Sequence, residues 1–441
     1  MLVTSNPAQA HKHTAIALGN FDGLHRGHQQ VIAQILPASC HSLSGKVGHL
    51  DDLDRLAPTS PVAIATPLKL TVESNASNGK SNGNHDKPDL IPTVVTFAPH
   101  PREFFSGTQR SLLTPLPEKI AILEQMGIAQ LVLLPFDEEL AQLSAADFIQ
   151  KILIEQLGVQ KISVGHDFGF GHKRQGTVVD LQKIWGDRVC VVPDLQFELP
   201  PDFANGSGSG QKVDQLSNLN HPPEAVSPTT RISSSVIRAA LDKGEIKLAN
   251  HLLGRPYALI GAVETGAQLG RKIGFPTANL NLPARKLLPR NGVYAVTVTI
   301  LERKPTNPAQ IYDAVMNIGV RPTVHKTAPV NAAAPDDQNT SNQNIEPEPQ
   351  GESDPSDRTY SQSAQMQRKV EVHILDWSGD IYGQQLQVNL IDFLRPEQKF
   401  PSLDELKAQI AADCEAARQI LQNIEAENYL NDCNYLSMVS G

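Results

Sequence analysis

The hydrophobic positions in the first half of the chain alternate between short apolar runs and helical periodicities. Apolar runs rich in β-branched residues predict strands, and three- to four-residue apolar spacing bounded by Ser, Pro or Gly predicts helices. Strands are predicted at 13–18, 92–97, 130–136, 161–165 and 188–192, and helices at 27–36, 117–126, 145–157 and 178–185. This alternation is typical of a parallel sheet with helices on both faces.

The pattern changes after about residue 255. Two predicted helices, at 234–242 and 246–253, precede a series of runs with period-two alternation and turn signals between them. These runs predict strands at 257–263, 292–300, 311–318, 370–375 and 386–393, followed by a helix from Leu403 to about residue 426. Short alternating strands of this kind predict a small antiparallel barrel.

Three polar stretches interrupt both patterns, at residues 37–91, 201–230 and 325–367. They have too few apolar side chains to offset the entropy of ordering, so we expect surface insertions. The remaining chain is long enough for two domains. We predict the first at 13–244, with two of the insertions, and the second at 245–430, with the third.

Charge and cysteine content narrow the class of protein. The net charge is −9, but residues 336–357 alone carry seven acidic and no basic side chains, so the rest of the chain carries only −2. A nearly neutral core gives no support for a nucleic-acid or membrane surface. The four cysteines form no paired motif, and the sequence shows no signal peptide or membrane-spanning run. We expect free thiols and a cytoplasmic protein.

The first predicted strand leads into the sequence G-N-F-D-G-L-H-R-G-H, residues 19–28. Its glycines let backbone approach a ligand, the following helix offers free N–H groups, and His25 and His28 add donors for phosphoryl chemistry. A structural histidine pair is the alternative for an isolated H-x-x-H. The position after a strand and a glycine turn favours a polyphosphate site. Loops 99–101 and 165–171 follow other predicted strands, and therefore share the same ligand-binding edge.

Two further motifs carry candidate chemistry. In R-I-S-S-S-V-I-R, residues 231–238, serines begin a helix beside two arginines; this suits a triphosphate, although an ordinary helix cap is also consistent. Residues 266–279 combine three glycines in a pliable loop with Arg271 and Lys272, a reasonable phosphate cover. Thr277 and Asn279 lie one strand step apart, so both face one side and offer oxygen ligands for Mg²⁺. A capped barrel turn is equally consistent with that pair.

These motifs carry a family resemblance. The G-N-F-D-G-L-H-R-G-H and I-S-S-S-V-I-R segments resemble the H-x-G-H nucleotidyltransferases, and G-F-P-T-A-N, V-E-V-H-I-L-D and F-L-R-P-E-Q-K-F resemble riboflavin kinase. Together the chain resembles the bacterial bifunctional riboflavin kinase/FMN adenylyltransferases, or FAD synthetases, over nearly all of its length outside the insertions. The resemblance implies an α/β Rossmann-like nucleotidyltransferase domain, then a small antiparallel riboflavin kinase-like β-barrel with a C-terminal helix.

The resemblance also implies two reactions. In the barrel, Glu371 accepts the proton of the riboflavin 5′-hydroxyl as it attacks the γ-phosphate of ATP, while Thr277 and Asn279 hold Mg²⁺. In the first domain, the FMN phosphate attacks the α-phosphate of ATP, and FAD and pyrophosphate form. His25 and His28 then stabilise the transition-state charge, and Arg238 stabilises the leaving pyrophosphate.

The remaining roles follow from the same resemblance. Flavin-binding residues are expected at Asp167, Phe168 and Arg395, although a surface ion pair is the alternative for Arg395. ATP-binding residues are expected at Gly19, Asn20, Phe21, Asp22, Arg231, Ser234, Ser235, Gly270, Arg271 and Gly274. The expected ligands are ATP, riboflavin, FMN, FAD and Mg²⁺, with no nucleic-acid or membrane partner; the oligomeric state is left open.

Three other functions compete with this interpretation. A different adenylyl- or cytidylyltransferase leaves the P-T-A-N segment unexplained. A flavin-sensing protein without activity is expected to have lost some of the catalytic candidates, and all are present. A kinase-only chain requires that an insertion block the first site.

Overall fold

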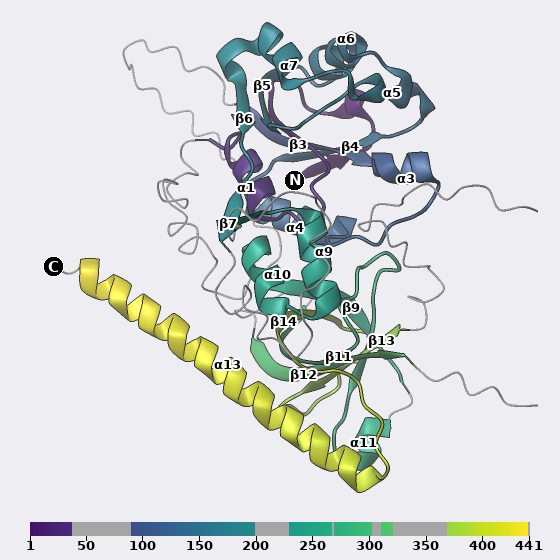
Figure 1. Ribbon diagram of the computed structural model, residues 1–441, viewed down its shortest axis with the longest axis vertical. Helices are drawn as coiled ribbons and strands as arrows, with labels where there is room; N and C mark the ends of the chain where they lie inside the picture. The colour runs from purple at the N-terminus through teal and green to yellow at the C-terminus, as the bar shows by residue number, and fades with distance from the viewer. Residues whose placement is uncertain (38–89, 199–228, 267–268, 302–309, 321–367, 440–441) are drawn as a thin grey trace, which may run out of the picture.

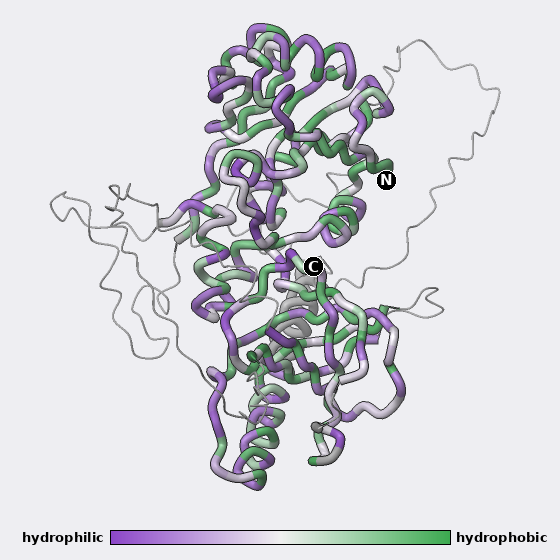
Figure 2. Tube along the Cα trace, turned by 90° about the vertical axis from the view of Figure 1, so that its right-hand side faces the viewer, coloured by the Kyte–Doolittle hydropathy of each residue, from purple (hydrophilic) through white to green (hydrophobic). Residues whose placement is uncertain are grey.

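The computed structural model describes residues 1–37, 90–198, 229–266, 269–301, 310–320 and 368–439. The three predicted insertions lie almost wholly outside the described residues. The described part holds a parallel sheet and a closed barrel, which are stacked along the long axis of the molecule with helices between them (Figures 1 and 2).

The first half of the chain forms a six-stranded sheet with the order β1-β4-β3-β2-β5-β6, in which every pairing is parallel. Its strands are β1 (Leu2–Thr4), β2 (Thr14–Leu18), β3 (Ile91–Ala98), β4 (Gln130–Pro135), β5 (Val159–Gly165) and β6 (Val189–Val192). The central strand β2 is buried along its whole length. Ile16 and Leu18 contribute to one hydrophobic cluster and Ala15 and Ala17 to another, so the sheet has a core on each face, as predicted.

Helices and helical turns connect these strands. They are η1 (Pro7–Gln9), α1 (Arg26–Ala33), α3 (Pro101–Ser106), α4 (Leu116–Gln125), α5 (Glu138–Gln142), α6 (Ala145–Asp147), η3 (Phe148–Gln156), η4 (His172–Arg174), α7 (Val178–Trp185) and η5 (Gly186–Arg188). The predicted helix at 145–157 is a turn of α-helix followed by a π-helical segment. Because β2 pairs with β3 on one side and β5 on the other, the loops after these three strands meet at one edge.

Two short strands and two helices link the sheet to the barrel: β7 (Gln196–Glu198), β8 (Thr229–Arg231), α9 (Ser234–Lys243) and α10 (Ile246–Leu253). Ile237 and Leu241 of α9 lie in the same hydrophobic cluster as barrel residues such as Tyr257 and Leu390. The helix α9 belongs to the predicted domain 13–244 but shares a hydrophobic core with the predicted domain 245–430. The boundary between the two domains therefore stays a prediction.

The second half closes into a six-stranded antiparallel barrel with the order β10-β13-β12-β11-β14-β9. The strands are β9 (Tyr257–Glu264), β10 (Ala278–Asn281), β11 (Gly292–Leu301), β12 (Ile311–Val320), β13 (Arg368–Ile374) and β14 (Gln385–Arg395). Five of them match predicted strands. The four-residue β10 was not predicted, and the pliable loop expected before it contains a short helix, α11 (Leu269–Ile273).

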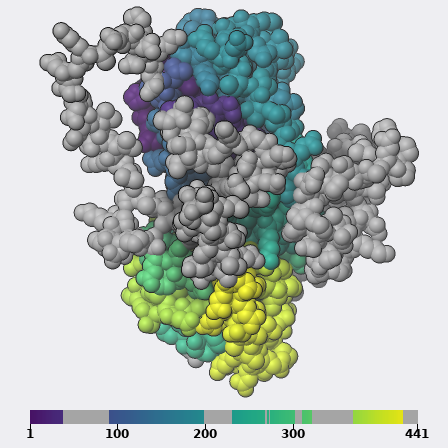
Figure 3. All heavy atoms as spheres, turned by 90° about the vertical axis from the view of Figure 1, so that its left-hand side faces the viewer, coloured from purple at the N-terminus to yellow at the C-terminus, as the bar shows by residue number. Residues whose placement is uncertain are grey.

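The last helix, α13 (Leu403–Val439), lies along the outside of the barrel and is longer than predicted (Figures 1 and 3). Cys414 and Ala417 of α13 pack against Val293, Ala295 and Val315, which form an apolar patch on the outer face of β11 and β12. None of the helices in the described part of the chain is both long and apolar enough to cross a membrane.

Candidate functional sites

The turn after β2 is tightly folded at the carboxyl edge of the sheet. Phe21 adopts a left-handed φ of 48° with its side chain only 1% exposed. A Cβ atom on Gly19 would lie 3.2 Å from the Phe21 ring, and one on Gly23, where φ is 89°, would lie 2.9 Å from Leu113. Glycine is therefore required at Gly23 by both conformation and space. The predicted glycine turn is therefore present and closely packed.

The two histidines stand at the start of α1, as predicted. His25 is the N-cap, and its Nδ1 accepts a hydrogen bond of 3.3 Å from the backbone N–H of His28. The two imidazole rings stack with their centroids 3.6 Å apart. A Cβ atom on Gly27 would lie 3.3 Å from the His25 ring, which explains the small residue between the histidines. Because Nδ1 of His25 accepts, a neutral His25 carries its proton on Nε2, where it can donate to a ligand.

Both imidazoles are neutral near pH 7. Burial lowers the pKa of His25 to about 4, and the nearby charge of Asp22 offsets this only in part. Burial, followed by the effect of His25, lowers the pKa of His28 well below its ordinary value. The buried Nδ1 of His28 has no hydrogen-bond partner among the described residues. A buried imidazole nitrogen without a partner is costly unless a ligand satisfies it.

Asp22 brings the two predicted phosphate motifs together. Its carboxylate accepts from the Arg238 guanidinium at 2.5 Å and from the backbone N–H of Leu113 at 2.9 Å, and its carbonyl accepts from the Ser234 hydroxyl at 2.8 Å. Arg238 also donates to the carbonyl of Ser111 at 2.8 Å. Burial alone would raise the pKa of Asp22, but the charge of Arg238 brings it below the ordinary value. Residues 216 positions apart thus form one charged cluster beside the histidines.

Other predicted residues of the first half lie nearby with different partners. Arg231 forms ion pairs with Asp167 and with Asp194, each at 2.9 Å. A residue predicted to bind ATP, Arg231, is therefore paired with a residue predicted to bind the flavin, Asp167. Burial would raise the pKa of Asp167, but its hydrogen bond from Arg231 lowers it. The ring of Phe168 stacks with that of Phe170, with centroids 5.9 Å apart. Asn20 and Ser235 are exposed at the turn and at the start of α9.

Three further residues lie at this edge, and sequence reasoning had placed only one of them, His100, there. Lys119 of α4 donates to the carbonyl of Asn20 at 3.4 Å, and burial lowers its pKa. His100 is the N-cap of α3, and burial lowers its pKa to about 4. Phe105 is 71% exposed, and its ring lies against those of Phe104 and Phe136. His100 lies in the P-H-P loop that was expected at this edge, whereas nothing in the sequence pattern pointed to Lys119 or Phe105.

The barrel holds a second polar cluster. Ala278 and Val372 face the barrel core, so their neighbours Asn279 and Glu371, which are paired across β10 and β13, point outward. The same register places Asn317 of β12 beside Glu371 and Glu264 of β9 beside Asn279. Within the described part of the chain, the half-buried Glu371 carboxylate makes no hydrogen bond or ion pair. The side chains of Glu264, Asn279, Glu371 and Asn317 thus form a row on the outer side of the barrel wall, here called the barrel row. The two residues predicted from the sequence, Asn279 and Glu371, both belong to it.

The glycine segment lies directly over this row. A Cβ atom on Gly266 would overlap the Asn279 side chain, and one on Gly270 would lie 3.3 Å from the Thr277 hydroxyl. Gly274 follows α11 with a φ of 93°. Arg271 of α11 is exposed. Thr277 and Asn279 therefore lie under the glycine segment, and their oxygen atoms suit Mg²⁺ as ligands. The described residues hold no group of three or more His, Cys, Asp and Glu side chains arranged for a metal.

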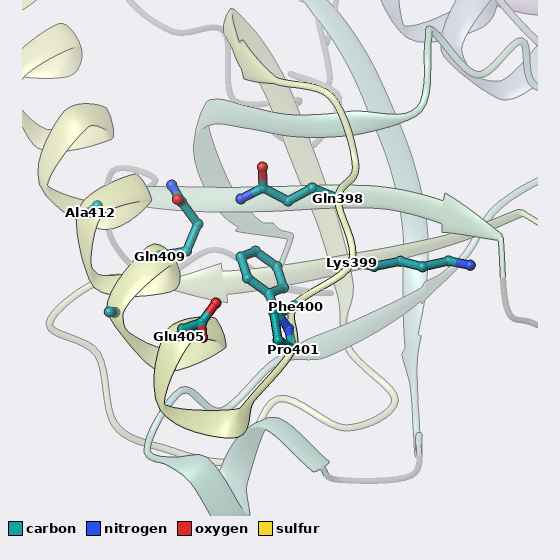
Figure 4. Close-up of a pocket in the computed structure, with 8 residues that line it drawn as sticks. Gln398, Lys399, Phe400, Pro401, Glu405, Gln409 and Ala412 are labelled. Carbon is teal, nitrogen blue, oxygen red and sulfur yellow. The ribbon is translucent and has the colours of Figure 1, made fainter.

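Arg395 is in an ion pair. Its guanidinium makes two hydrogen bonds with the Asp413 carboxylate of α13, at 2.8 and 2.7 Å. An ion pair at the surface was the alternative expected for this residue, whereas both side chains of this pair are largely buried. Gln409 also donates to Asp413, at 2.9 Å, and lines a cavity of about 460 Å³. Figure 4 shows the Phe400 ring in this cavity, between α13 and the segment that carries Gln398, with Lys399 pointing away. The cavity thus lies between α13 and residues 398–401, and the ion pair is linked to it through Gln409.

The fold and the first site define the class of protein: a nucleotidyltransferase-like parallel α/β domain joined to a closed antiparallel barrel. A profile of the FAD synthetase family matches residues 7–43 and 80–198, and a riboflavin kinase profile matches 253–348 and 356–421. The chain is 31% identical to the bifunctional riboflavin kinase/FMN adenylyltransferase of Escherichia coli K12, covering 92% of this chain and 91% of that one. It belongs to the bifunctional riboflavin kinase/FMN adenylyltransferase family.

Other relatives agree with this assignment. The proteins of the same name from Pseudomonas fluorescens and Bacillus subtilis are 30% and 27% identical; the matches cover 93% of this chain in both cases and 94% and 93% of the relatives. A crystal structure from Streptococcus pneumoniae, described as a macrolide-efflux protein, is 25% identical with a TM-score of 0.60 and covers 95% of this chain and 98% of that one. This likeness shows the two-part fold of the chain.

Proposed function

We propose that this chain makes FAD in two ATP-dependent steps, each on its own half. The barrel phosphorylates riboflavin to FMN, and the α/β half transfers the adenylyl group of ATP to FMN with release of pyrophosphate. The observation that carries the proposal is that Asp22, His25 and Arg238 lie together at the carboxyl edge of the sheet. The polar cluster that contains Asn279 and Glu371 lies separately, on the barrel.

At the adenylyltransferase site, the cluster supplies charge stabilisation without a covalent intermediate. The start of α1 and the imidazoles of His25 and His28 bind the reacting phosphates as hydrogen-bond donors. Neutral imidazoles donate without placing a proton on the attacking FMN phosphate, which must stay anionic to attack the α-phosphorus. Arg238 stabilises the pyrophosphate as the bond to the α-phosphate breaks. Asp22 fixes the position of Arg238.

ATP binding at this site draws on the surrounding turn and on the start of α9. The backbone of Gly19, Asn20 and Phe21 shapes the nucleotide site. Ser234 and Ser235 supply hydroxyls at a helix N-terminus, and Arg231 adds positive charge. The flavin lies toward Asp167 and Phe168, on the loop after β5, which borders the same edge of the sheet.

At the kinase site, Glu371 is the general base. Its carboxylate has no partner among the described residues, so it is free to accept the proton of the 5′-hydroxyl as the oxygen attacks the γ-phosphorus of ATP. Thr277 and Asn279 would hold Mg²⁺, which would neutralise phosphate charge. Gly270, Arg271 and Gly274 cover the phosphates. Arg395 and the cavity beside α13 bind riboflavin.

Chromatography of the flavins tests the proposal. The purified chain is incubated with Mg²⁺, ATP and either riboflavin or FMN. Riboflavin is expected to give FMN and then FAD, and FMN to give FAD directly. If riboflavin gives FMN but no FAD forms, the adenylyltransferase activity assigned to the α/β half is contradicted. If supplied FMN gives FAD but riboflavin is not phosphorylated, the kinase activity assigned to the barrel is contradicted.

A further inference from the structure

A short segment of the α/β half, Ser111–Thr114, lies between the adenylyltransferase site and the barrel. On one side it holds the site: the N–H groups of Leu113 and Thr114 donate to the Asp22 carboxylate at 2.9 and 3.4 Å. The Thr114 hydroxyl also accepts from the backbone N–H of Gly23 at 2.9 Å. The position of Asp22 and of the turn before His25 therefore depends on this segment.

On its other side the same segment is held by the barrel half. Leu112 forms a parallel bridge with Lys286: its N–H donates to the carbonyl of Arg285 at 2.6 Å, and its carbonyl accepts from Leu287 at 2.9 Å. The side chain of Leu113 is fully buried in the barrel's hydrophobic cluster. Ser111–Thr114 is thus held by contacts with the barrel half as well as by contacts with the turn after β2.

Lys286 lies at the centre of this contact. Its ammonium donates to the carbonyl of Leu113 at 2.8 Å and to the Glu118 carboxylate at 2.6 Å, and it lies 4.3 Å from the centre of the Tyr257 ring. The carbonyl of Leu113 and the N–H of Thr114 belong to one peptide group, so Lys286 and Asp22 hold opposite ends of that group. Lys286 is 2% exposed and Glu118 6% exposed.

Arg255 makes a second link from the barrel half. Its guanidinium donates to the carbonyl of Gly23 at 2.7 Å and to that of Leu24 at 3.0 Å, the two residues before His25. Leu24 has a left-handed φ of 45°, a conformation that a non-glycine residue adopts only when its surroundings hold it. The conformation of the turn before His25 is therefore held by a residue 231 positions away.

We propose that Lys286 and Arg255 are positioning residues of the adenylyltransferase site, although both belong to the kinase half of the chain. The inference rests on the proposed function of the α/β half. Both side chains bind the backbone that holds Asp22 or carries His25, and the charge of Arg255 also lowers the pKa of His25 and of His28. Positioning errors of about 1 Å at a reacting centre can lower a rate roughly 100-fold.

The buried pair offers a variant that separates positioning from stability. Burial raises the pKa of Glu118 and lowers that of Lys286, and each group's charge offsets the other's shift in part. The Oε1 atom of Glu118 has no partner among the described residues. Replacing a buried ion pair by apolar side chains is often neutral or stabilising. Here Glu118 also stabilises the charge of the buried Arg255, and Lys286 also donates to the carbonyl of Leu113. The double variant Lys286→Met, Glu118→Leu removes both charges of the pair together and is expected to fold, and its Tm is measured beside the two activities.

The test measures both activities of that double variant in the full chain. The kcat for FAD formation from FMN is expected to fall roughly 10-fold to 100-fold. The KM for FMN and the kcat for riboflavin phosphorylation are expected to stay near the parent values. A matched control is Lys247→Met, which breaks the exposed 3.0 Å pair with Asp392 in the same half and should change neither rate.

Two results would overturn the inference: FAD formation at the parent kcat in the folded double variant, or an equal loss of both activities. If the double variant does not fold, Arg255→Lys decides in the same way, because lysine keeps the charge but cannot donate to Gly23 and Leu24 as a fork. A parent chain that makes no FAD from FMN contradicts the proposed function instead.

Discussion

Truncation of His28 isolates the chemistry of the first site. In His28→Ala, the imidazole stacked 3.6 Å from His25 and edge-on to Phe21 is removed, together with the buried Nδ1 atom that has no partner among the described residues. Loss of one preorganised donor in a dry site costs about 2.7–4 kcal/mol in the transition state, which is roughly 10²–10³ in kcat. FAD formation from FMN is therefore expected to fall by roughly that factor.

The assay follows FAD by chromatography at saturating ATP and FMN, with FMN formation from riboflavin as an internal control. The kinase rate should be unchanged, because no described residue of the barrel row contacts His28. His11→Ala is a matched control, since His11 is exposed and precedes β2, at the opposite edge of the sheet. FAD formation by His28→Ala at near the parent rate would refute the role of this histidine.

Three further predictions concern other residues. Glu371→Gln keeps the shape but removes the base, so phosphorylation of riboflavin should fall roughly 10²–10⁴-fold while supplied FMN is still converted to FAD; chromatography with each flavin checks both. One terminal nitrogen of Arg238 donates to both Asp22 and the carbonyl of Ser111, which leaves the other nitrogens of the guanidinium for the pyrophosphate. Arg238→Lys keeps the charge but has a single nitrogen for all three, so kcat/KM for FAD formation should fall roughly 10-fold or more, with the kinase rate unchanged. The free energy of unfolding should fall as the pH is lowered from 6.5 toward about 4, because His25 binds a proton in the unfolded chain but stays neutral where it is buried in the folded chain. Urea unfolding of the parent and of His25→Gln over this pH range should show a smaller pH dependence in the variant.

Local patterns in the sequence predicted much of the fold. The parallel sheet followed from apolar strands alternating with helices, and His25 was expected at a helix start because a strand, a glycine turn and an apolar periodicity follow in order. Capping and strand pairing act over a few residues, so the sequence around His25 and Glu371 was enough to place both correctly in their elements.

What the sequence could not show lies in contacts between distant segments. The pairing of Asp22 with Arg238 was not foreseen, although both were singled out, because it depends on how α9 packs against the sheet. Lys286 is an ordinary loop lysine in the sequence and becomes buried only through the bridge to Leu112. The strand β10 was missed because four residues are too few for a period-two pattern to stand out beside the glycines.

The central claim is that two separate sites use two different phosphates of ATP. It is tested most directly by supplying riboflavin with Mg²⁺ and ATP labelled at either the α- or the γ-phosphorus. The account predicts that γ-label enters FMN and persists in FAD, whereas α-label appears only in FAD. Label from the α-phosphorus in FMN, or FAD that lacks it, would contradict the account.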